Sequence, residues 1–182
     1  MARSRGSGQY VGLYHQKHMP EKDGTDRKIL TAVSQGLISY SEATRFSPEK
    51  RAETVEWAKK NGKMMPKHLL YPRTKGFIAC VKKLRQAPHI KAVYDITVAY
   101  AHGSDFNKPP TFAQTLMLPR LSQRWQFHVN VQRWPLDELP HGDAELAKWL
   151  EDRWLEKGQY LEGLREMLER GASWDALLRK EQ

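Results

Sequence analysis

The sequence predicts an α/β protein, in which a mixed sheet is flanked by helices and a long helix lies near the C-terminus. Two stretches, 90–100 and 125–133, show the two-residue alternation of side chains that is typical of strands. Three others, 48–61, 74–85 and 143–168, carry helix start signals or apolar residues at three- and four-residue steps. Because strands and helices alternate along the chain, we expect them to pack as layers around one core.

The bulk composition limits the class of protein. The chain has 182 residues, of which 40% are hydrophobic, so there is room for one domain with a core but not for two large domains. Its one cysteine, Cys80, excludes an internal disulfide framework and a multi-cysteine zinc site. No run approaches the roughly 20 apolar residues that span a bilayer. The first residues, 1–15, lack the apolar core of a secretory signal, so we expect a soluble or peripheral protein.

The positive charge is concentrated in the middle of the chain. Lys and Arg outnumber Asp and Glu by 6 to 3 in residues 1–40 and by 13 to 4 in residues 41–91, whereas residues 92–182 have 11 against 14. The segment charges of +3, +9 and −3 sum to the formal net charge of +9. A local excess of this kind favours an anionic partner: a phosphorylated metabolite, a phospholipid surface or a nucleic acid. A solvated basic face without a partner is the alternative.

The first part of the chain predicts short elements after an irregular start. Residues 1–25 show no periodicity, 26–35 predict a short helix and 37–40 predict a short buried strand. A clear helix then covers 48–61, because Ser47 can cap it, a proline suits its first position and the glycine that follows can end it. This arrangement predicts a turn between the strand and the helix.

The rest of the chain alternates strands and helices. Residues 69–71 predict another short strand, and 74–85 predict an amphipathic helix. After the strand at 90–100, the strand at 125–133 is expected to leave one face exposed, because apolar and polar residues alternate along it. Asp143 is expected to cap the long final helix. The apolar stripe of that helix comprises Leu146, Trp149, Leu150, Trp154, Leu161, Leu164 and Leu168.

The stretch 37–46 is the part of the sequence that most strongly suggests chemistry. A predicted strand ends there at a turn with the carboxylate of Glu42, the hydroxyl of Thr44 and the guanidinium of Arg45, and a helix begins close behind. Unpaired amides at that helix terminus and the planar guanidinium are suited to hold the oxygens of a phosphate. The alternative is an ordinary loop in which Glu42 and Arg45 pair at the surface.

Four ordered blocks resemble the lysophosphatidic acid (glycerol-phosphate) acyltransferase family. Residues 42–45, Glu-Ala-Thr-Arg, resemble its Glu-Gly-Thr-Arg motif, and residues 66–77, which include Pro-Arg-Thr-Lys-Gly-Phe, resemble a block of its long eukaryotic branch. The strand at 93–100 resembles the next strand of that branch, and 127–150 resemble its C-terminal domain. The likeness extends over 37–163, which is far more specific than a single tetrapeptide.

The resemblance implies an enzyme that moves a fatty acyl group from coenzyme A to a hydroxyl of a lysophospholipid. Acyl-CoA would be a co-substrate, with no cofactor and no metal. The resemblance also implies that Arg45 holds the substrate phosphate, that Glu42 and Thr44 shape the loop and contact the glycerol end, and that Arg73 and Lys75 lie near the same basic surface. The expected location is the endomembrane system, including the endoplasmic reticulum, with peripheral membrane contact.

Two departures from the family pattern concern catalysis. Ala43 replaces the usual glycine, which strains the turn if a positive φ is needed. The family motif Asn-His-x-x-x-x-Asp, in which the histidine takes the hydroxyl proton, has one counterpart by spacing, His18 and Asp23. Lysine replaces the asparagine, a proline interrupts the stretch and Glu42 follows closely, so we interpret this pairing as chance. We therefore expect an incomplete acyltransferase-like fold with weak or no turnover.

The remaining candidate residues have structural interpretations. His15 and His18 are three residues apart and have no third metal ligand nearby. His128 is interpreted as a surface or packing residue, and Cys80, among apolar neighbours in a helix, as a buried inert thiol. The two tryptophans of the final helix are expected to anchor the core, with an interfacial membrane role as the alternative.

The sequence thus predicts three segments. Residues 1–36 form the irregular lead-in, 37–100 the acyltransferase-like segment with the phosphate-binding turn, and 101–182 the acyltransferase C-terminal segment. The alternative function is a basic, non-catalytic module that binds an anionic lipid surface or nucleic acid. No recognised nucleic-acid-binding motif appears, so nucleic acid is the less favoured partner.

Overall fold

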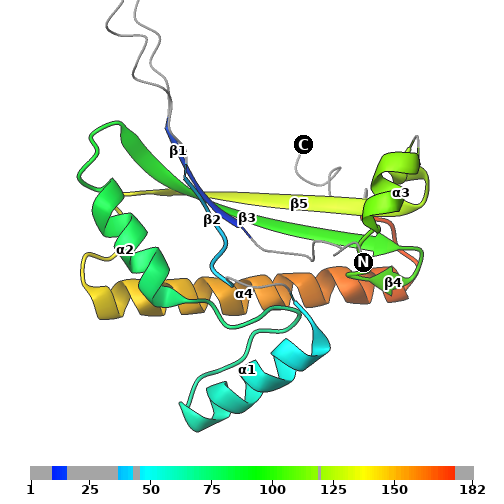
Figure 1. The fold of residues 1–182 in the computed structure, drawn as a ribbon, viewed down its shortest axis with the longest axis horizontal. Helices are drawn as coiled ribbons and strands as arrows, with labels where there is room; N and C mark the ends of the chain where they lie inside the picture. The colour runs from blue at the N-terminus through cyan, green and yellow to red at the C-terminus, as the bar shows by residue number, and fades with distance from the viewer. Residues whose placement is uncertain (1–9, 16–36, 43–45, 119, 175–182) are drawn as a thin grey trace, which may run out of the picture.

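The computed structural model describes residues 10–15, 37–42, 46–118 and 120–174 (Figure 1). The expected α/β class is confirmed, with helices flanking a sheet and a long helix near the C-terminus. In chain order the elements are β1 (Tyr10–His15), β2 (Leu37–Ser39), α1 (Pro48–Lys60), α2 (Thr74–Leu84), β3 (Ile90–His102), β4 (Asp105–Phe106), α3 (Phe112–Met117), the short 3₁₀ helix η2 (Leu121–Gln123), β5 (Trp125–Pro135) and α4 (Asp143–Glu169).

The sheet is organised around β3, the longest strand. β3 pairs with β5 over 92–102, from Ala92 opposite Pro135 to His102 opposite Trp125, and with β1 over 90–96. β2 continues the sheet beyond β1, and the short β4 pairs with the end of β3. Every strand pair among the described residues is antiparallel. β3 is therefore the central strand, with β1 on one side and β5 on the other.

Helix α4 lies along one face of the sheet and forms most of the core with it (Figure 1). Its apolar stripe is buried as predicted, with Leu146, Leu150, Trp154 and Leu161 all at 0% exposure. Burying aliphatic and aromatic side chains in this way stabilises a fold by about 1.5–3 kcal/mol per side chain. The predicted cap is wrong by one position: Gly142 is the N-cap, and Asp143 is the first residue of the helix.

The two faces of β5 have unexpected environments. The polar face lies against α4, where His128 Nε2 is 2.5 Å from the hydroxyl of Tyr160. The apolar face, with Phe127, Val129 and Val131, is exposed on the side away from α4. The sequence predicts one exposed face on this strand, and the structure shows that it is the apolar one.

The shorter predicted elements have mixed outcomes. Helix α1 is confirmed, with Ser47 Oγ accepting from the Lys50 amide at 3.2 Å, and α2 is confirmed with its apolar side buried. The strand predicted at 69–71 is wrong, because this stretch is irregular, although two of its residues are core. The strand β2 exists, but its side chains are exposed or half-buried instead of buried. The helix predicted at 26–35 lies outside the described residues.

Candidate functional site

Three of the residues predicted to form the site, Glu42, Arg73 and Lys75, lie in the described part of the chain. The others lie outside it, so their predicted roles stay predictions: His18, Asp23, Thr44 and Arg45. Ala43 also lies outside, and the question of its backbone conformation stays with it. The site is therefore built from residues on either side of the turn and from the segments that pack against them.

Glu42 is buried at the start of the turn, with 3% of its surface exposed. Its Oε1 accepts a hydrogen bond from the amide of Leu70 at 3.1 Å. Burial raises the pKa of Glu42 to about 7, while the Leu70 amide, Trp154 and Lys157 hold it lower than burial alone would. Glu42 is not among the residues that line the adjacent cavity. Its position suits the predicted role of shaping the loop.

The loop 66–73 holds the turn from the side of α1. The amide of Arg73 donates a hydrogen bond to the carbonyl of Ser41 at 2.7 Å. From α1, the Arg51 guanidinium donates to two carbonyl oxygens of the loop, at 3.3 and 3.0 Å. Because these bonds satisfy backbone groups that are partly buried, they fix the loop relative to both the turn and the helix.

The same loop is tied to α4 through Glu162. This carboxylate is 2.6 Å from His68 Nε2, 3.1 Å from Lys67 Nζ and 3.0 Å from Arg165 Nε. Hydrogen bonds from Arg165, His68 and Lys67 hold the pKa of Glu162 well below its usual range. The backbone at His68 takes a left-handed conformation, with φ of 61°, which is uncommon for a residue other than glycine.

A cavity of about 890 Å³ opens where the turn, α1 and the start of α2 meet. Arg73 and Lys75 line it, and Trp57 and Tyr71 form an aromatic wall, with ring centroids 5.1 Å apart. The cavity is further lined by Ser39, Tyr40, Ser41, Glu53, Thr54, Pro72, Thr74, Gly76, Phe77 and Cys80. The structure thus places the two predicted basic residues beside the turn, in a space large enough for a small ligand.

The charge of this cavity is positive. Its one acidic residue, Glu53, pairs with Lys50 at 2.7 Å, whereas Arg73 and Lys75 form no ion pair among the described residues. The first amides of α2 also lie here, since that helix begins at Thr74. Unpaired cations at a helix N-terminus can bind an anion, and the aromatic wall can contact apolar groups. The arrangement suits a ligand with a phosphate and an apolar part.

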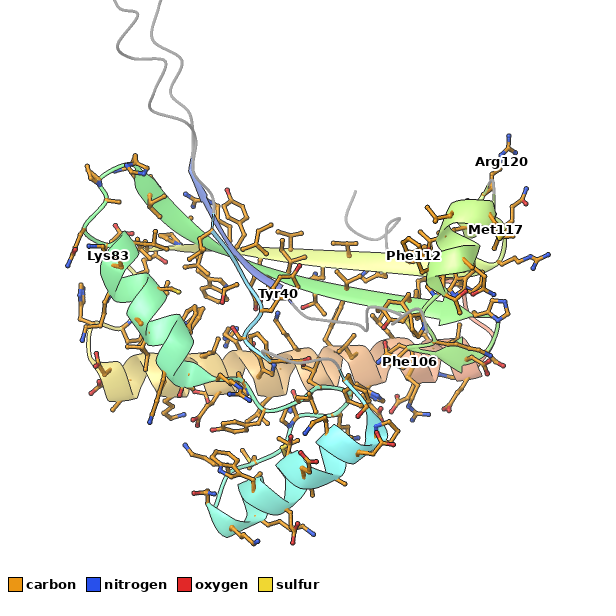
Figure 2. All side chains as sticks on the ribbon, in the orientation of Figure 1. Tyr40, Lys83, Phe106, Phe112, Met117 and Arg120 are labelled. Atoms are coloured by element: carbon orange, nitrogen blue, oxygen red, sulfur yellow. The ribbon has the colours of Figure 1, made fainter. Side chains whose placement is uncertain are left out.

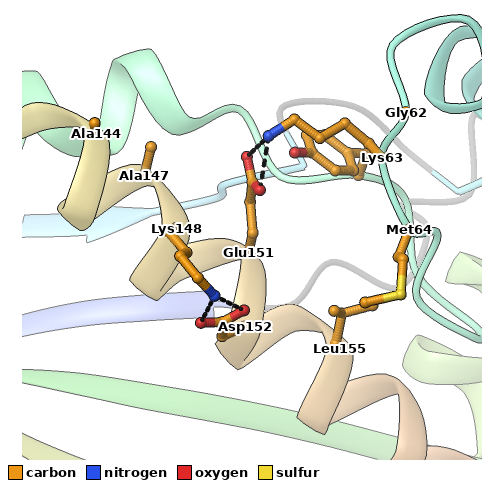
Figure 3. Close-up of a pocket in the computed structure, with 10 residues that line it drawn as sticks. Gly62, Lys63, Met64, Ala144, Ala147, Lys148, Glu151, Asp152 and Leu155 are labelled. Atoms are coloured by element: carbon orange, nitrogen blue, oxygen red, sulfur yellow. Dashed lines mark hydrogen bonds and ion pairs between the residues drawn. The ribbon is translucent and has the colours of Figure 1, made fainter.

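A second hollow, of about 480 Å³, lies between the end of α1 and α4 (Figure 3). Its charged side chains are paired with one another. Lys63 contacts Glu151 at 2.9 Å, and Lys148 contacts Asp152 at 2.7 Å. Because its cations are already neutralised, this hollow is a poorer site for an anionic ligand than the cavity beside the turn.

Comparison with known proteins agrees with the resemblance seen in the sequence. The family described as "Acyltransferase C-terminus" matches residues 117–167, which include β5 and most of α4. The chain is related to the C-terminal portion of the lysophospholipid acyltransferase family. No solved structure matches the chain.

Three relatives of this chain have names that refer to different lysophospholipids. The chain is 35% identical to lysocardiolipin acyltransferase 1 of Mus musculus over 127 residues, which is 69% of this chain and 31% of the relative. It is 32% identical to 1-acyl-sn-glycerol-3-phosphate acyltransferase delta of Homo sapiens, over 75% of this chain and 36% of the relative. It is also 32% identical to lysophosphatidylinositol acyltransferase 10 of Caenorhabditis elegans, over 69% of this chain and 30% of the relative. The chain thus spans about a third of the length of these acyltransferases.

A buried ion pair lies close to Glu42, and sequence reasoning missed it. Lys157 of α4 pairs with Asp95 of β3, each side chain 4% exposed, and also donates to the Ile96 carbonyl at 3.2 Å. Lys157 Nζ lies 4.5 Å from the ring centroid of Trp154, beside Glu42. Burial lowers the pKa of Lys157 and raises that of Asp95. The available signal was an aspartate at position 95 in the interior of a long predicted strand.

Several other predicted residues can now be placed. Trp154 is a core residue, and Trp149 packs against the core, so both are confirmed as anchors. His128 is confirmed as a packing residue by its contact with Tyr160. Cys80 is half-buried and lines the cavity beside the turn, so the prediction of a fully buried thiol is wrong. The reason is that Cys80 lies on the side of α2 that borders the cavity, whereas Val81, the next residue, is buried in the core.

Metal and membrane-spanning features are absent from the described part of the chain. No group of three His, Cys, Asp or Glu residues there could hold a metal ion. None of the helices among these residues combines the length and the apolar composition needed to cross a bilayer. The side chain of His15 is not described, so its predicted lack of a metal stays a prediction.

Proposed function

We propose that this chain is part of an acyl-CoA-dependent acyltransferase that acts on a lysophospholipid such as 1-acylglycerol 3-phosphate. The names of the relatives support the reaction class. In this reaction the lipid hydroxyl attacks the thioester carbonyl, a carbon–oxygen bond forms, the carbon–sulfur bond breaks, and the hydroxyl proton passes through a base to the departing thiolate. The reaction needs acyl-CoA as co-substrate and no cofactor.

One observation carries the binding part of the proposal: Arg73 and Lys75 line the cavity beside the turn and form no ion pair with any residue that the structure describes. A phosphate held by them and by the start of α2 would leave the glycerol end near the turn that bears Arg45. The aromatic pair of Trp57 and Tyr71 offers an apolar surface to the rest of the lipid. In this proposal Arg45 contributes its guanidinium to the same phosphate, and Glu42 shapes the turn from beneath.

The single cysteine of the chain allows a direct test of ligand binding. Cys80 lines the cavity, so a bound ligand should slow its alkylation by a maleimide. We expect short-chain 1-acylglycerol 3-phosphate to protect Cys80 and the matching monoacylglycerol, which lacks the phosphate, to protect it much less. Equal protection by the two lipids would show that the phosphate is not recognised.

Substitutions test whether Arg73 and Lys75 recognise the phosphate. The double variant Arg73→Ala, Lys75→Ala should raise the lipid concentration for half-protection by about tenfold or more, because charge-assisted hydrogen bonds are lost. Lys83→Ala is the matched control, since Lys83 lies on the same helix but does not line this cavity. Unchanged protection in the double variant would overturn the assignment.

Acyl transfer is tested separately by following thiol release from acyl-CoA in the presence of lysophosphatidic acid. We expect weak or no turnover by the isolated chain, and no effect of His18→Ala on whatever turnover there is. Loss of an aligned general base alone lowers rates by about 10²–10⁴-fold. Robust turnover that is abolished by His18→Ala would instead establish His18 as the base. Turnover that is indifferent to Arg45→Ala would remove Arg45 from the phosphate site.

The proposal includes a location at the endomembrane system, including the endoplasmic reticulum, with peripheral contact to its lipid surface. Enzymes of this reaction class take a substrate from the bilayer, which supports membrane contact. Fractionation of cells that express the tagged chain should recover it with endoplasmic reticulum membranes and release it with salt or carbonate. Recovery in the soluble fraction would contradict this part of the proposal.

A further inference from the structure

We propose that α3 and the outer face of β5 form a docking face for an anionic lipid membrane. The docking face comprises the exposed side chains of Phe112, Leu116, Met117, Phe127, Val129 and Val131. The inference rests on the peripheral contact proposed above and assigns it to one surface. It is tested without acyl transfer and without a ligand in the cavity, so the two proposals can fail independently.

The first observation is the exposure of large apolar side chains on α3. Phe112 is 61% exposed, Leu116 is 68% exposed and Met117 is 81% exposed. No residue of this helix is buried, and Figure 2 shows Phe112 and Met117 on the side of the sheet away from α4. A helix of a soluble domain normally turns its apolar residues toward a core, so this helix has an apolar surface with no partner among the described residues.

The second observation is that β5 extends the same apolar surface. Phe127, Val129 and Val131 are 47%, 56% and 52% exposed, because α4 lies against the opposite, polar face of this strand. The helix α3 stands above the same side of the sheet, near the start of β5 (Figure 1). The apolar residues of helix and strand therefore present one side of the molecule to a partner.

The third observation is the charge around this surface. From Phe106 to Leu136 the sequence contains no Asp or Glu and has Lys108, Arg120, Arg124 and Arg133. The three arginines are exposed and form no ion pair among the described residues. Arg133 lies on the same face of β5 as the exposed valines, and Figure 2 shows Arg120 pointing outward beyond α3. Long basic side chains can reach anionic headgroups while apolar neighbours enter the interface.

The carboxylates of α4, on the other face of the sheet, are largely paired, whereas the arginines of the docking face are not. Helix α4, from Asp143 to Glu169, contains eight Asp or Glu and four Lys or Arg, a net charge of −4. Three of these carboxylates pair with lysines of the segment 63–82: Glu151 with Lys63, Glu162 with Lys67 and Asp143 with Lys82. The arginines near the docking face have no ion pair among the described residues, so they favour an anionic lipid surface over a neutral apolar partner.

The α3 helix is held in a defined conformation that suits insertion. Thr111 and Gln114 form a reciprocal capping box, in which Thr111 Oγ1 accepts from the Gln114 amide at 3.2 Å and Gln114 Oε1 accepts from the Thr111 amide at 2.8 Å. At the base of this segment, Trp125 Nε1 donates to the Lys108 carbonyl at 3.0 Å. The helix is therefore already ordered in the free protein, so membrane binding loses little conformational entropy at this segment.

Co-sedimentation with vesicles tests the docking face. We expect the chain to bind vesicles of phosphatidylcholine mixed with phosphatidylserine, and to bind pure phosphatidylcholine vesicles about tenfold or more weakly. The triple variant Phe112→Ser, Leu116→Ser, Met117→Ser should bind the mixed vesicles at least about tenfold more weakly, because burial of its apolar surface is lost. The control is Met64→Ser, since Met64 is 71% exposed but lies at the hollow between α1 and α4.

The basic residues are tested by Arg120→Glu, Arg124→Glu, with Lys59→Glu, Lys60→Glu on α1 as the control. The first pair should lose most of its preference for phosphatidylserine and much of its dependence on salt, and the α1 pair should retain both. Because these side chains are exposed, circular dichroism should show that every variant remains folded. Equal loss in the control pair would mean that total charge, and not this face, decides binding.

Insertion can be observed at single positions in a Cys80→Ser background. An environment-sensitive fluorophore attached after Met117→Cys should brighten on mixed vesicles, and the same label after Met64→Cys should not. No binding by the unaltered chain, an unchanged triple variant, or brightening at Met64 alone would each overturn the proposal. So would sedimentation of the free chain as a dimer that the triple variant converts to a monomer, because the face would then belong to a second copy.

Discussion

The carboxylate of Glu42 accepts a hydrogen bond from the backbone amide of Leu70, 28 residues further along the chain, at 3.1 Å. This bond joins the turn that bears the motif to the loop 66–73. That loop is tied to α4 through Glu162, so the turn is held by residues from the C-terminal segment. The C-terminal segment, 101–182, therefore supports a cavity whose lining, among the described residues, comes from the segment 37–100.

The buried position of Glu42 predicts an unusual dependence of stability on pH. Its pKa is raised from 4.5 to about 7 because it is buried. Between these pH values the folded chain keeps the proton that the unfolded chain releases, so this residue's contribution to stability falls as pH rises from 4.5 to 7, by up to about 3 kcal/mol. Glu42→Gln keeps the acceptor for Leu70 and has no proton to lose. We expect it to raise the free energy of unfolding at pH 8 by about 2–3 kcal/mol and to change it little at pH 4.5.

Urea unfolding across this pH range measures the effect. Glu53→Gln is the matched control, because Glu53 is an exposed carboxylate on α1 whose substitution should give a curve parallel to that of the unaltered chain. The difference between the unaltered chain and Glu42→Gln cancels the titration of groups common to both. A difference that does not change between pH 4.5 and pH 8 would show that Glu42 titrates normally.

A second prediction concerns Gly158, where the loop crosses α4. A Cβ at this position would lie 2.7 Å from the amide nitrogen of Lys67 and 2.9 Å from its carbonyl oxygen. Because these are backbone atoms, the loop must move to admit a methyl group. We expect Gly158→Ala to lower the free energy of unfolding by about 1–3 kcal/mol, despite the better helix propensity of alanine. It should also weaken protection of Cys80 by the phosphate lipid, because the displaced loop carries Leu70 and Arg73.

Gly163→Ala in the same helix is the control for this prediction. A Cβ there meets no atom within 4 Å, so the substitution should raise stability by up to about 1 kcal/mol. Thermal unfolding of the two variants should therefore shift the midpoint in opposite directions. Shifts of the same sign and size would mean that the close approach at Gly158 has no consequence.

Local sequence signals predict the helices of this fold well. Ser47 and the proline after it mark the start of α1, and the spacing of Leu146, Leu150 and Trp154 defines the buried stripe of α4. Such signals depend only on residues close in the sequence, so they predict the same helix whatever the rest of the chain packs against it. The environment of a strand face depends on what packs against it, and no local pattern on β5 indicates that α4 covers its polar side.

The candidate site is predictable only where it depends on local sequence, and not where it depends on packing. The basic block around Arg73 is visible in the sequence, and the structure places Arg73 and Lys75 at a cavity that Ser41, the residue before the motif, also lines. The burial of Glu42 could not be foreseen, because a carboxylate in a turn is normally exposed. The contact between Asp95 and Lys157 joins residues 62 positions apart, and only the packing of α4 on β3 creates it.

The pair formed by Lys157 and Asp95 gives the last prediction. Lys157→Met would leave the Asp95 carboxylate buried without a partner, at a cost of about 3–5 kcal/mol in the free energy of unfolding. Because the unpaired carboxylate would hold its proton in the folded state, the loss should be largest at high pH and shrink as pH falls. Adding Asp95→Leu should recover most of the stability, since a well-packed apolar pair can replace a buried ion pair.

A double-mutant cycle of these variants measures the coupling between the two side chains. Lys148→Met is the matched control in the same helix, because the pair of Lys148 and Asp152 is exposed and should contribute less than about 1 kcal/mol. If Lys157→Met costs no more than Lys148→Met, the pair is not isolated from water as the structure shows. If it costs the expected amount and also weakens the protection of Cys80, then α4 supports the cavity through the charge beneath Glu42 as well as through the loop.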